Sequence, residues 1–369
     1  MTVVFSLILS LYCLLLVVFL FGWIMIRRQS MPVKGNATPG ISIVVAVRNE
    51  EENIQTLLHD LSAIVYPAGK FEVIIVNDHS TDATTEKVKA RIGNLSRARL
   101  LELPEGKKGK KEALRLGIEQ AQFEIIATTD ADCRFSKNWL TCLSLYFEQG
   151  ETKMVVGAVK LTADNSFFSR LQVTEFASLV GSTAAAIGLG HPILCNGANL
   201  AFQKSAFNEV QGYDGNLQIA SGDDEFLMRK IMHHYPGGIK FLNYYEAVVS
   251  SHAQTTIQGF FHQRLRWAGK WKHNTDSLTR LLAVFIFTSH IAFAGLVFRS
   301  FFWPDITLGL VIGKLFLEGV FIFWVDRFLD RRFDILAFLS LQIMYPVYVT
   351  TIGVFSLFSA YRWKSRNYK

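Results

Sequence analysis

The amino end of the chain carries a run of residues without formal charge, and this run constrains the fold more than any other feature. Val3 to Ile26 is 24 residues long. At about 1.5 Å per residue, a helix of that length crosses a hydrocarbon core of roughly 30 Å. The run therefore predicts a transmembrane helix. A cleaved signal peptide is the alternative, but such peptides begin with a basic region, whereas Arg27 and Arg28 follow this run.

The carboxyl-terminal part of the chain has the same apolar composition. Leu281 to Trp303 and Ile306 to Val325 are each long enough to span a membrane. Trp303-Pro304-Asp305 predicts a tight turn between them. Phe333 to Ala360 contains Pro346 near its middle, which leaves two alternatives: one tilted span, or two short halves that return to the same side.

Basic residues beside these runs predict the orientation. Arg27, Arg28 and Lys34 place the following domain in the cytoplasm by the positive-inside rule. The net charge of +7 then favours anionic lipid headgroups and a phosphorylated substrate over nucleic acid as partners. We expect a multi-pass protein of the inner (plasma) membrane, and the side of the C-terminus stays open. The expected parts are an N-terminal transmembrane helix (1–26), a linker (27–40), a cytoplasmic catalytic domain (41–280), a transmembrane region of about three helical segments (281–360) and a basic tail (361–369).

The middle of the chain alternates strand and helix patterns. Ile41 to Val47, Phe71 to Val76 and Phe123 to Thr129 are short apolar runs rich in β-branched residues, and helical spacing follows the first two. This alternation predicts an α/β domain with a mainly parallel sheet covered on both faces. In such domains ligands bind beyond the carboxyl ends of the strands. No GxGxxG follows the first strand, which argues against a dinucleotide-dependent oxidoreductase.

Acidic side chains follow the third strand. Asp130 and Asp132 form a DxD triplet there. Two carboxylates separated by one residue can face a common divalent ion, which can neutralise the two phosphates of a departing nucleoside diphosphate. The structural alternative is an acidic turn that caps a helix expected over Ser136 to Gly150.

Other residues at the same predicted edge suit a sugar nucleotide. Asn49 and Glu50 follow the first strand. Asp78 follows the second and can accept hydrogen bonds from a uracil N–H or a ribose hydroxyl. Lys110 is one of four lysines on a glycine-bearing loop before a helix, where it can contact phosphate. A plain turn and a solvated charge run are the alternatives.

A second acidic motif supplies a base. An inverting sugar transfer needs a group that takes the proton from the attacking hydroxyl. Asp223 and Asp224 precede a helical run, and we expect Asp224 to be the base and Asp223 its neighbour. The reverse assignment and helix capping by Asp223 stay open.

The last motif stands just before the apolar tail. Gln263, Arg266 and Trp267 fall on one helical face by their i, i+3, i+4 spacing. An arginine can bind the leaving diphosphate, a glutamine can support it, and an indole can stack on a sugar ring. An amphipathic helix at a membrane surface, with Arg264 and Lys270 facing lipid headgroups, is compatible with this interpretation.

One ionisable pair lies inside an apolar run. Lys314 and Glu318 are four residues apart in the second C-terminal run. Such a pair can mark a polar path, but mutual neutralisation on one helix is the simpler interpretation.

With these motifs in order, the chain resembles the membrane-bound family 2 glycosyltransferases with a D, DxD, D, QxxRW signature, such as cellulose, poly-N-acetylglucosamine and hyaluronan synthases. The resemblance covers roughly Ile41 to Trp267. It implies a GT-A fold, a UDP-sugar donor, a Mg or Mn ion, inversion, and a lipid or growing glycan as acceptor.

The resemblance also implies residue roles. Asp78 would contact uridine, Asp130 and Asp132 the diphosphate and metal, Gln263 and Arg266 the pyrophosphate, Asp224 would be the base and Trp267 would contact the acceptor. Cys195, Asn196 and Gly197 stand where the synthases carry a Cys-Gly-Ser acceptor loop.

This chain departs from the polymer synthases in having about four candidate spans and no evident regulatory domain. Modification of a lipid and polymer synthesis with a partner subunit for export therefore both stay open. A non-catalytic or partner-dependent export or synthase subunit is the alternative function.

Overall fold

The structure is a computed structural model that describes two compact parts of the chain. The described residues are 1–29, 32, 38–93, 95, 97–148, 150–219, 221–269, 276–303, 306–358, 361–363 and 366–368. Ile26–Thr162 and Ile187–His252 form one part, which we call the sheet unit; Met1–Met25, Ala163–Ala186 and Ala253–Lys369 form the other, the helical unit. Lys34, Lys270, Pro304, Asp305, Lys364 and Lys369, to which the sequence assigns topological roles, lie outside the described residues.

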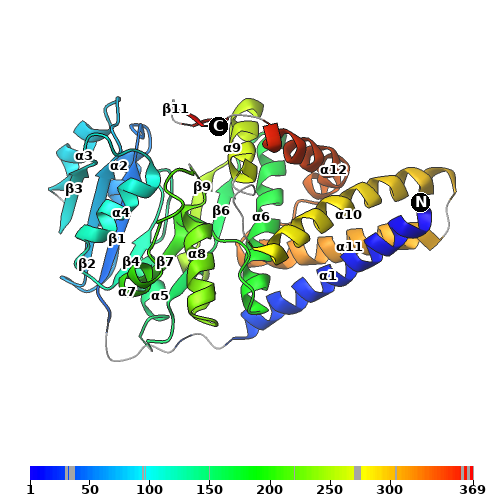
Figure 1. Cartoon of the computed structure of the whole chain (residues 1–369), viewed down its shortest axis with the longest axis horizontal. Coiled ribbons are helices and arrows are strands. Elements are labelled where there is room, and N and C mark those ends of the chain that lie inside the picture. The colour runs from blue at the N-terminus through cyan, green and yellow to red at the C-terminus, as the bar shows by residue number, and fades with distance from the viewer. Residues whose placement is uncertain are drawn as a thin grey trace. The chain divides into compact units, whose positions relative to one another are not determined.

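The sheet unit is built around a seven-stranded sheet with the order β3-β2-β1-β4-β7-β5-β8 (Figure 1). Neighbouring strands run parallel except at β7, which is antiparallel to β4 and β5. A smaller sheet pairs β6 with β9 in parallel. The strands are β1 (Ile41–Val47), β2 (Phe71–Asn77), β3 (Ala98–Glu102), β4 (Ile125–Thr128), β5 (Met154–Gly157), β6 (Val159–Thr162), β7 (Leu200–Gln203), β8 (Ile239–Leu242) and β9 (Val249–His252). The expected mainly parallel sheet is confirmed.

Helices follow the strands of this sheet as the alternation predicts. They are α2 (Ile54–Ser62), α3 (Thr84–Ile92), α4 (Lys110–Gln120), α5 (Trp139–Ser144), α7 (Lys204–Glu209) and α8 (Asp223–His234). Helix α4 packs closely on β1 because Gly117 has no side chain: a Cβ there would lie 2.4 Å from Cγ1 of Val44. Helix α5 is shorter than the helix expected over Ser136 to Gly150.

The carboxyl ends of the central strands meet at one edge of the sheet. Val47 of β1 pairs with Asn77 of β2, and Val44 of β1 pairs with Thr128 of β4. All three strands are parallel, so the residues that follow them emerge on the same side. This is the edge at which the sequence places its candidate ligand-binding residues.

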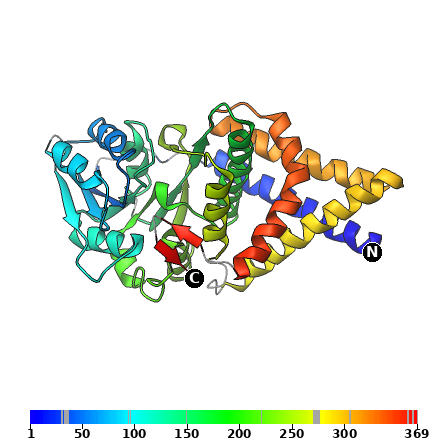
Figure 2. The same cartoon turned by 90° about the horizontal axis from the view of Figure 1, so that it is seen from above.

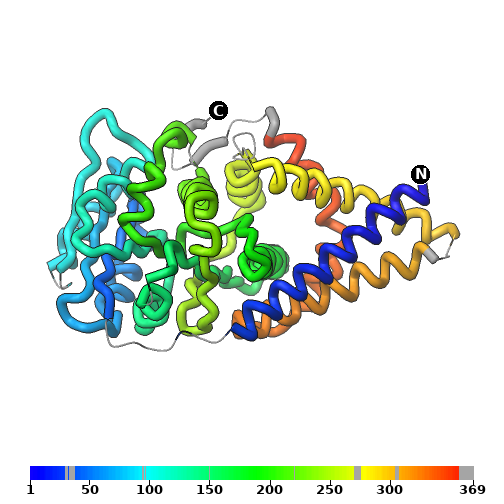
Figure 3. The backbone as a smooth tube through the Cα atoms, turned by 60° about the horizontal axis from the view of Figure 1, so that its bottom comes forward, coloured from blue at the N-terminus to red at the C-terminus, as the bar shows by residue number. Residues whose placement is uncertain are grey.

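The helical unit contains the apolar helices. They are α1 (Thr2–Arg28, whose last residues belong to the sheet unit), α10 (Ser277–Phe302), α11 (Ile306–Phe328) and α12 (Ile335–Phe358). All four are long and apolar enough to cross a membrane. Helix α12 continues through Pro346, so it is a single helix rather than two halves. In Figures 2 and 3 the blue α1 runs beside the yellow and orange α10 and α11, and a buried cluster that includes Leu9 and Leu296 joins them.

Two further helices complete this unit. They are α6 (Phe167–Gly188, whose last two residues belong to the sheet unit) and α9 (Ile257–Gly269). Both come from the segment expected to form the catalytic domain, yet they cluster with the apolar helices. Helix α6 packs closely on α11, since a Cβ on Gly181 would lie 2.5 Å from Cγ2 of Val325. The short strands β10 (Tyr361–Trp363) and β11 (Arg366–Tyr368) form an antiparallel pair near the C-terminus.

Candidate active site

The functional edge of the sheet unit brings three motifs of the sequence together around one lysine. Nζ of Lys110 lies 2.7 Å from Oδ1 of Asp130 and 3.4 Å from Oδ2 of Asp223. These residues come from the start of α4, the loop after β4 and the start of α8. The lysine side chain is 21% exposed and that of Asp130 36%, so the cluster is open to solvent on one side.

Lys110 is held in place by the loop that precedes it. Gly109 has a φ of +100°, a conformation that suits glycine, and its N–H donates to Oδ2 of Asp78 at 3.1 Å. Asp78 is only 2% exposed. Its carboxylate therefore fixes the start of α4, and through it the lysine, in addition to the nucleoside contact that we expect from the sequence.

Asn49 and Glu50 hold the turns after β1 and β2 against each other. Oδ1 of Asn49 accepts a hydrogen bond from the Thr81 N–H at 2.8 Å, and the Glu50 N–H donates to Oγ1 of Thr84 at 2.8 Å. Asn49 has a φ of +50°, which is uncommon for a residue with a side chain. Such conformations persist where the surroundings enforce them, and they gather at functional edges.

The DxD turn is fixed from outside the motif. Arg134 makes a bidentate ion pair with Asp60, at 2.5 and 2.9 Å, and its backbone bridges to Ser250 of β9. Oδ2 of Asp132 accepts a hydrogen bond from Oγ of Ser251 at 2.9 Å. The orientation of Asp132 is thus set by β9.

Asp224 is tied to the segment that contains Cys195, Asn196 and Gly197. The Gly197 N–H donates to Oδ2 of Asp224 at 2.9 Å, and the Gly197 carbonyl accepts from Oγ1 of Thr128 at 2.8 Å. A Cβ on Gly197 would lie 3.2 Å from Oδ2 of Asp223. This segment therefore lies directly against both aspartates, while the side chain of Asn196 caps its own turn through the Ala198 N–H.

The charges in this cluster stabilise one another. Burial alone would lower the pKa of Lys110, but Asp130, Asp223 and Asp224 raise it well above its usual value. Burial would raise the pKa of Asp223, but Lys110 and Lys111 hold it below its usual range. Both groups are therefore charged near neutral pH. A cation with two carboxylates beside it can exchange one of them for a phosphate oxygen without leaving its place.

Several residues that build this edge are not marked as site residues by the sequence. Tyr213 is buried beside the cluster, and burial followed by the charge of Asp223 raises its pKa well above its usual value. Lys111 donates to the Asn216 carbonyl at 2.7 Å and so anchors the loop that carries Tyr213. Arg134 and Ser251 were missed as well. Their partners are distant in the sequence, and no local pattern marks them.

Gln263, Arg266 and Trp267 belong to α9 and hence to the helical unit. All three are partly buried, and the Trp267 ring lies 6.0 Å from that of Phe176. Arg264 does not face lipid headgroups, and that expectation is wrong. Its side chain is 4% exposed and ion-paired with Glu175 of α6, because α6 and α12 cover that side of α9.

The oxygen donors of the DxD turn fit a divalent ion that is shared with a substrate. Among the residues that the structure describes, no three or more His, Cys, Asp and Glu side chains gather as a metal site. Asp130 and Asp132 alone would leave most of the coordination to other ligands. Mg²⁺ and ions like it commonly bind through one or two carboxylates plus substrate phosphates and water, and the donor set here fits that pattern.

Comparisons with known proteins agree with the fold. Residues 42–211 match the family described as Glycosyl transferase family 2. The poly-beta-1,6-N-acetyl-D-glucosamine synthase of Staphylococcus epidermidis is 28% identical over 231 residues, which are 62% of this chain and 54% of that protein. The beta-monoglucosyldiacylglycerol synthase of a Nostoc species is 28% identical over 248 residues, 66% of this chain and 51% of that protein. The chain thus spans about half the length of these curated relatives.

A solved structure shares the fold over nearly the whole chain. It is a mannosyltransferase from Pyrobaculum calidifontis in complex with GDP-Man and Mn2+. Its TM-score is 0.64 at 17% sequence identity, and the match covers 97% of this chain and 99% of the mannosyltransferase. At this identity the likeness supports the fold alone.

Proposed function

We propose that this chain, whose residues 42–211 match the family described as Glycosyl transferase family 2 and which is similar to a polysaccharide synthase and a glycolipid synthase, is an integral-membrane inverting glycosyltransferase. It would move a sugar from a UDP-sugar to a lipid or growing polysaccharide acceptor at the cytoplasmic face. The observation that carries the proposal is the cluster of Lys110, Asp130, Asp223 and Asp224 at the carboxyl edge of the sheet.

The proposed reaction is a single displacement. An acceptor hydroxyl attacks the anomeric carbon, its proton passes to Asp224, and the bond from that carbon to the diphosphate oxygen breaks, with the electron pair leaving on the diphosphate. We assign the base to Asp224 because the ion pair with Lys110 engages Asp223, whereas the contacts of Asp224 to Gly197 place it against the proposed acceptor segment. The N–H groups of Gly197 and Glu225 orient the Asp224 carboxylate.

The leaving diphosphate needs positive charge around it. Lys110 supplies one such charge in the sheet unit, and we assign a second to Arg266 of α9, supported by Gln263. A Mg or Mn ion held by Asp130 and Asp132 would neutralise charge on the diphosphate. Asn49, Glu50 and Asp78 would bind the nucleoside.

The acceptor is assigned to two elements. Gly197 lies against both aspartates, so Cys195, Asn196 and Gly197 would border the attacking hydroxyl. Trp267 would stack on an acceptor sugar. We further propose that the four apolar helices span the inner membrane with the sheet unit in the cytoplasm, where nucleotide sugars are made. For a polymer product, a partner subunit would export the glycan.

The experiment that tests this function measures nucleotide release by the detergent-purified protein. The donors are a panel of UDP-sugars together with GDP-mannose, since the structurally similar mannosyltransferase was solved with GDP-Man. Each is tested with Mg²⁺, with Mn²⁺ and with EDTA, with and without added membrane lipid. We expect release from one donor that requires a metal and is lost in Asp224→Asn.

The product then separates the acceptors. A single glycolipid species supports lipid modification, whereas a ladder of sizes supports polymer synthesis. Metal-independent release, or release that survives Asp224→Asn, would contradict the assigned roles. No release from any donor would favour the alternative, a subunit that is non-catalytic or that requires a partner.

A further inference from the structure

Glu175 of α6 is a buried carboxylate that joins two other helices of the helical unit. Its Oε2 accepts from Nη2 of Arg264 on α9, and its Oε1 accepts from the hydroxyl of Tyr348 on α12 at 3.2 Å. Each carboxylate oxygen therefore binds a different helix. Burial would lower the pKa of Arg264, but Glu175 raises it above its usual value, so the guanidinium stays charged.

Arg264 lies inside the QxxRW motif, at a position that the motif leaves unspecified. Its Nη1 donates to Oε1 of Gln263 at 2.9 Å. Its guanidinium carbon lies 4.3 Å from the centre of the Trp267 ring and 4.6 Å from that of Phe260, so the cation is held between two aromatic faces. One arginine thus contacts two of the three motif residues.

These contacts determine the orientation of the Gln263 amide and of the Trp267 ring. Because Oε1 of Gln263 accepts from Arg264, the amide is oriented with its NH₂, a hydrogen-bond donor, away from the guanidinium. A donor has the polarity that a diphosphate oxygen requires. The cation over its face likewise fixes the tilt of the Trp267 ring, and Phe176 of α6 supports the ring 6.0 Å away.

We propose that Glu175, Arg264 and Tyr348 are positioning residues that hold Gln263 and Trp267 in the orientation that transfer requires. This inference rests on the proposed function. It assigns the three residues a role beyond holding helices together. A small displacement of binding groups lowers the rate of transfer even when the helices stay packed.

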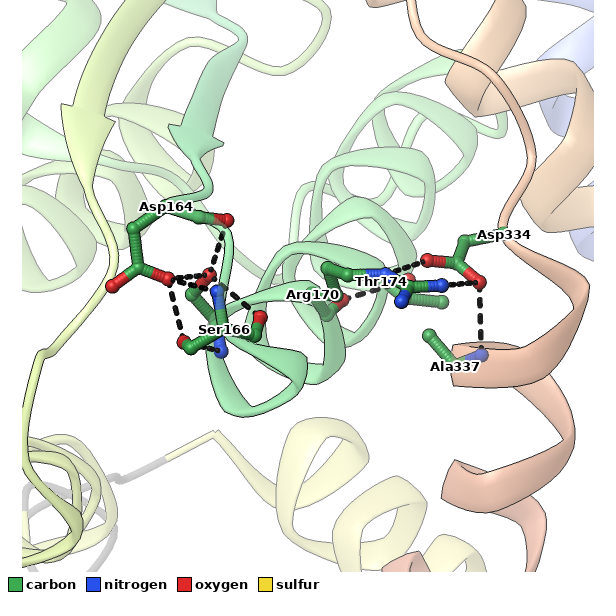
Figure 4. Close-up of polar contacts among 7 residues, drawn as sticks. Asp164, Ser166, Arg170, Thr174, Asp334 and Ala337 are labelled. Carbon is green, nitrogen blue, oxygen red and sulfur yellow. Dashed lines mark hydrogen bonds and ion pairs between the residues drawn. The ribbon is translucent and has the colours of Figure 1, made fainter.

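A neighbouring ion pair on the same helix supplies a matched control. Arg170 of α6 binds Asp334 in a bidentate pair, at 2.6 and 2.9 Å, and Asp334 also caps the start of α12 through the Ala337 N–H (Figure 4). In the part of the chain that the structure describes, the hydrogen bonds and ring contacts of this pair stay within α6 and the beginning of α12, and the charge of Asp334 also acts on Asp326 and Arg331. The Arg170–Asp334 pair joins α6 to α12, as the contact between Glu175 and Tyr348 does, without contacting α9.

The decisive variant removes both charges of the buried pair together. Glu175→Gln alone leaves Arg264 buried and unpaired, so it lowers both the melting temperature and kcat/KM. In the double variant Glu175→Gln with Arg264→Met no charge is left unpaired, and we expect the melting temperature to return toward that of the wild type. We expect kcat/KM to stay about tenfold or more below wild type, with a raised donor KM, because Gln263 and Trp267 have lost their anchor.

The control double variant is Arg170→Met with Asp334→Asn, in which the asparagine can still cap α12. We expect it to leave the donor KM unchanged whatever its melting temperature. If the Glu175/Arg264 double variant regains the wild-type KM and kcat together with its stability, the three residues are structural only and the proposal is overturned.

A second readout does not depend on transfer. Hydrogen exchange of the α9 amides, residues 257–269, is compared between the wild type and the Glu175/Arg264 double variant. We expect faster exchange confined to α9, and unchanged exchange there would overturn the proposal. Absence of transfer in the wild type would instead contradict the proposed function, so the two failures can be told apart.

Discussion

Two regions of the molecule each pair a lysine with acidic side chains, and they differ in how completely the lysine is enclosed. At the edge of the sheet, Lys110 has two carboxylates and an open side, and Asp130 is exposed to solvent. In the apolar bundle, Lys314 is 2% exposed and lies 2.8 Å from Glu318 one turn along α11. The pairing expected for Lys314 and Glu318 is confirmed.

The bundle pair is enclosed by partners from three other helices. Lys314 also donates to Gln342 of α12, and its ammonium lies 4.1 Å from the centre of the Phe293 ring on α10. Glu318 accepts a hydrogen bond from the hydroxyl of Tyr12 on α1 at 2.7 Å. All four apolar helices therefore contribute to one polar cluster.

This difference in enclosure distinguishes a binding site from a purely structural ion pair. A lysine with two partly exposed carboxylates can give one of them up to a ligand, because solvent and substrate reach the cluster. Lys314 is enclosed by side chains of its own helix and of the surrounding helices and has no partner to exchange for a ligand, and these contacts fix the register of the helices. Substitutions at the open cluster should therefore change activity, and those at the closed cluster should change stability.

The largest effect should come from the open cluster. We expect Asp224→Asn to lower kcat by about 10³-fold, which is within the range for loss of a general base. An asparagine can still accept one of the two backbone hydrogen bonds that Asp224 accepts, so the melting temperature should change little. Steady-state kinetics and thermal unfolding of the same preparation check this. A large loss of stability in Asp224→Asn would contradict the expectation that substitutions at the open cluster change activity rather than stability.

Glu318→Gln should have the opposite profile. It leaves the Lys314 ammonium buried without a counter-ion, and we expect a destabilisation of about 3 kcal/mol. The kcat of the protein that remains folded should not change. Unfolding in mixed detergent micelles measures the first quantity, and kinetics normalised to folded protein measure the second. Lys314→Met combined with Glu318→Met serves as the control, because it removes both charges and should recover most of the stability.

Lys110→Met removes the positive charge of the open cluster. Loss of a charged contact to the leaving diphosphate should lower kcat/KM by about 10²-fold, which corresponds to about 2.7 kcal/mol at the transition state. Stability should change far less than in Glu318→Gln, since water reaches the carboxylates that Lys110 leaves behind. Equal losses of stability in Lys110→Met and Glu318→Gln would show that Lys110 also has a structural role.

The sequence predicted the elements of the open cluster well because each is marked locally. A polar or acidic residue directly after a buried strand, or a lysine on a glycine-bearing loop, needs no knowledge of distant partners. Asp78, Lys110 and Asp130 were found in this way, and the parallel order of the strands brought Asp130 and Lys110 together.

Contacts between distant segments could not be predicted in this way. The sequence offered an amphipathic helix with Arg264 facing lipid headgroups as a compatible interpretation, and it did not indicate the actual partner of this arginine. Its partner Glu175 lies 89 residues earlier, on a helix whose Ala, Ser and Gly content gave no sign of a buried carboxylate. The hydrogen bond from Ser251 to Asp132, 119 residues earlier, could not be predicted for the same reason.

The smallest predicted effect concerns pH and the stability that the open cluster adds. The folded pKa of Asp223 lies below its usual value, so its contribution is present above the unfolded pKa of about 4 and is lost as pH falls through the folded pKa. The folded pKa of Lys110 is raised, so its contribution is present below the unfolded pKa of about 10 and is lost as pH rises through the folded value. The contribution of the Lys110–Asp223 pair to the stability of the wild type should therefore be flat from about pH 5 to 9 and shrink in acid. Thermal unfolding across this range measures it. A slope near neutral pH would mean that one of these two groups titrates there, and the cluster could then not keep the fixed charges that distinguish it as a site for a diphosphate.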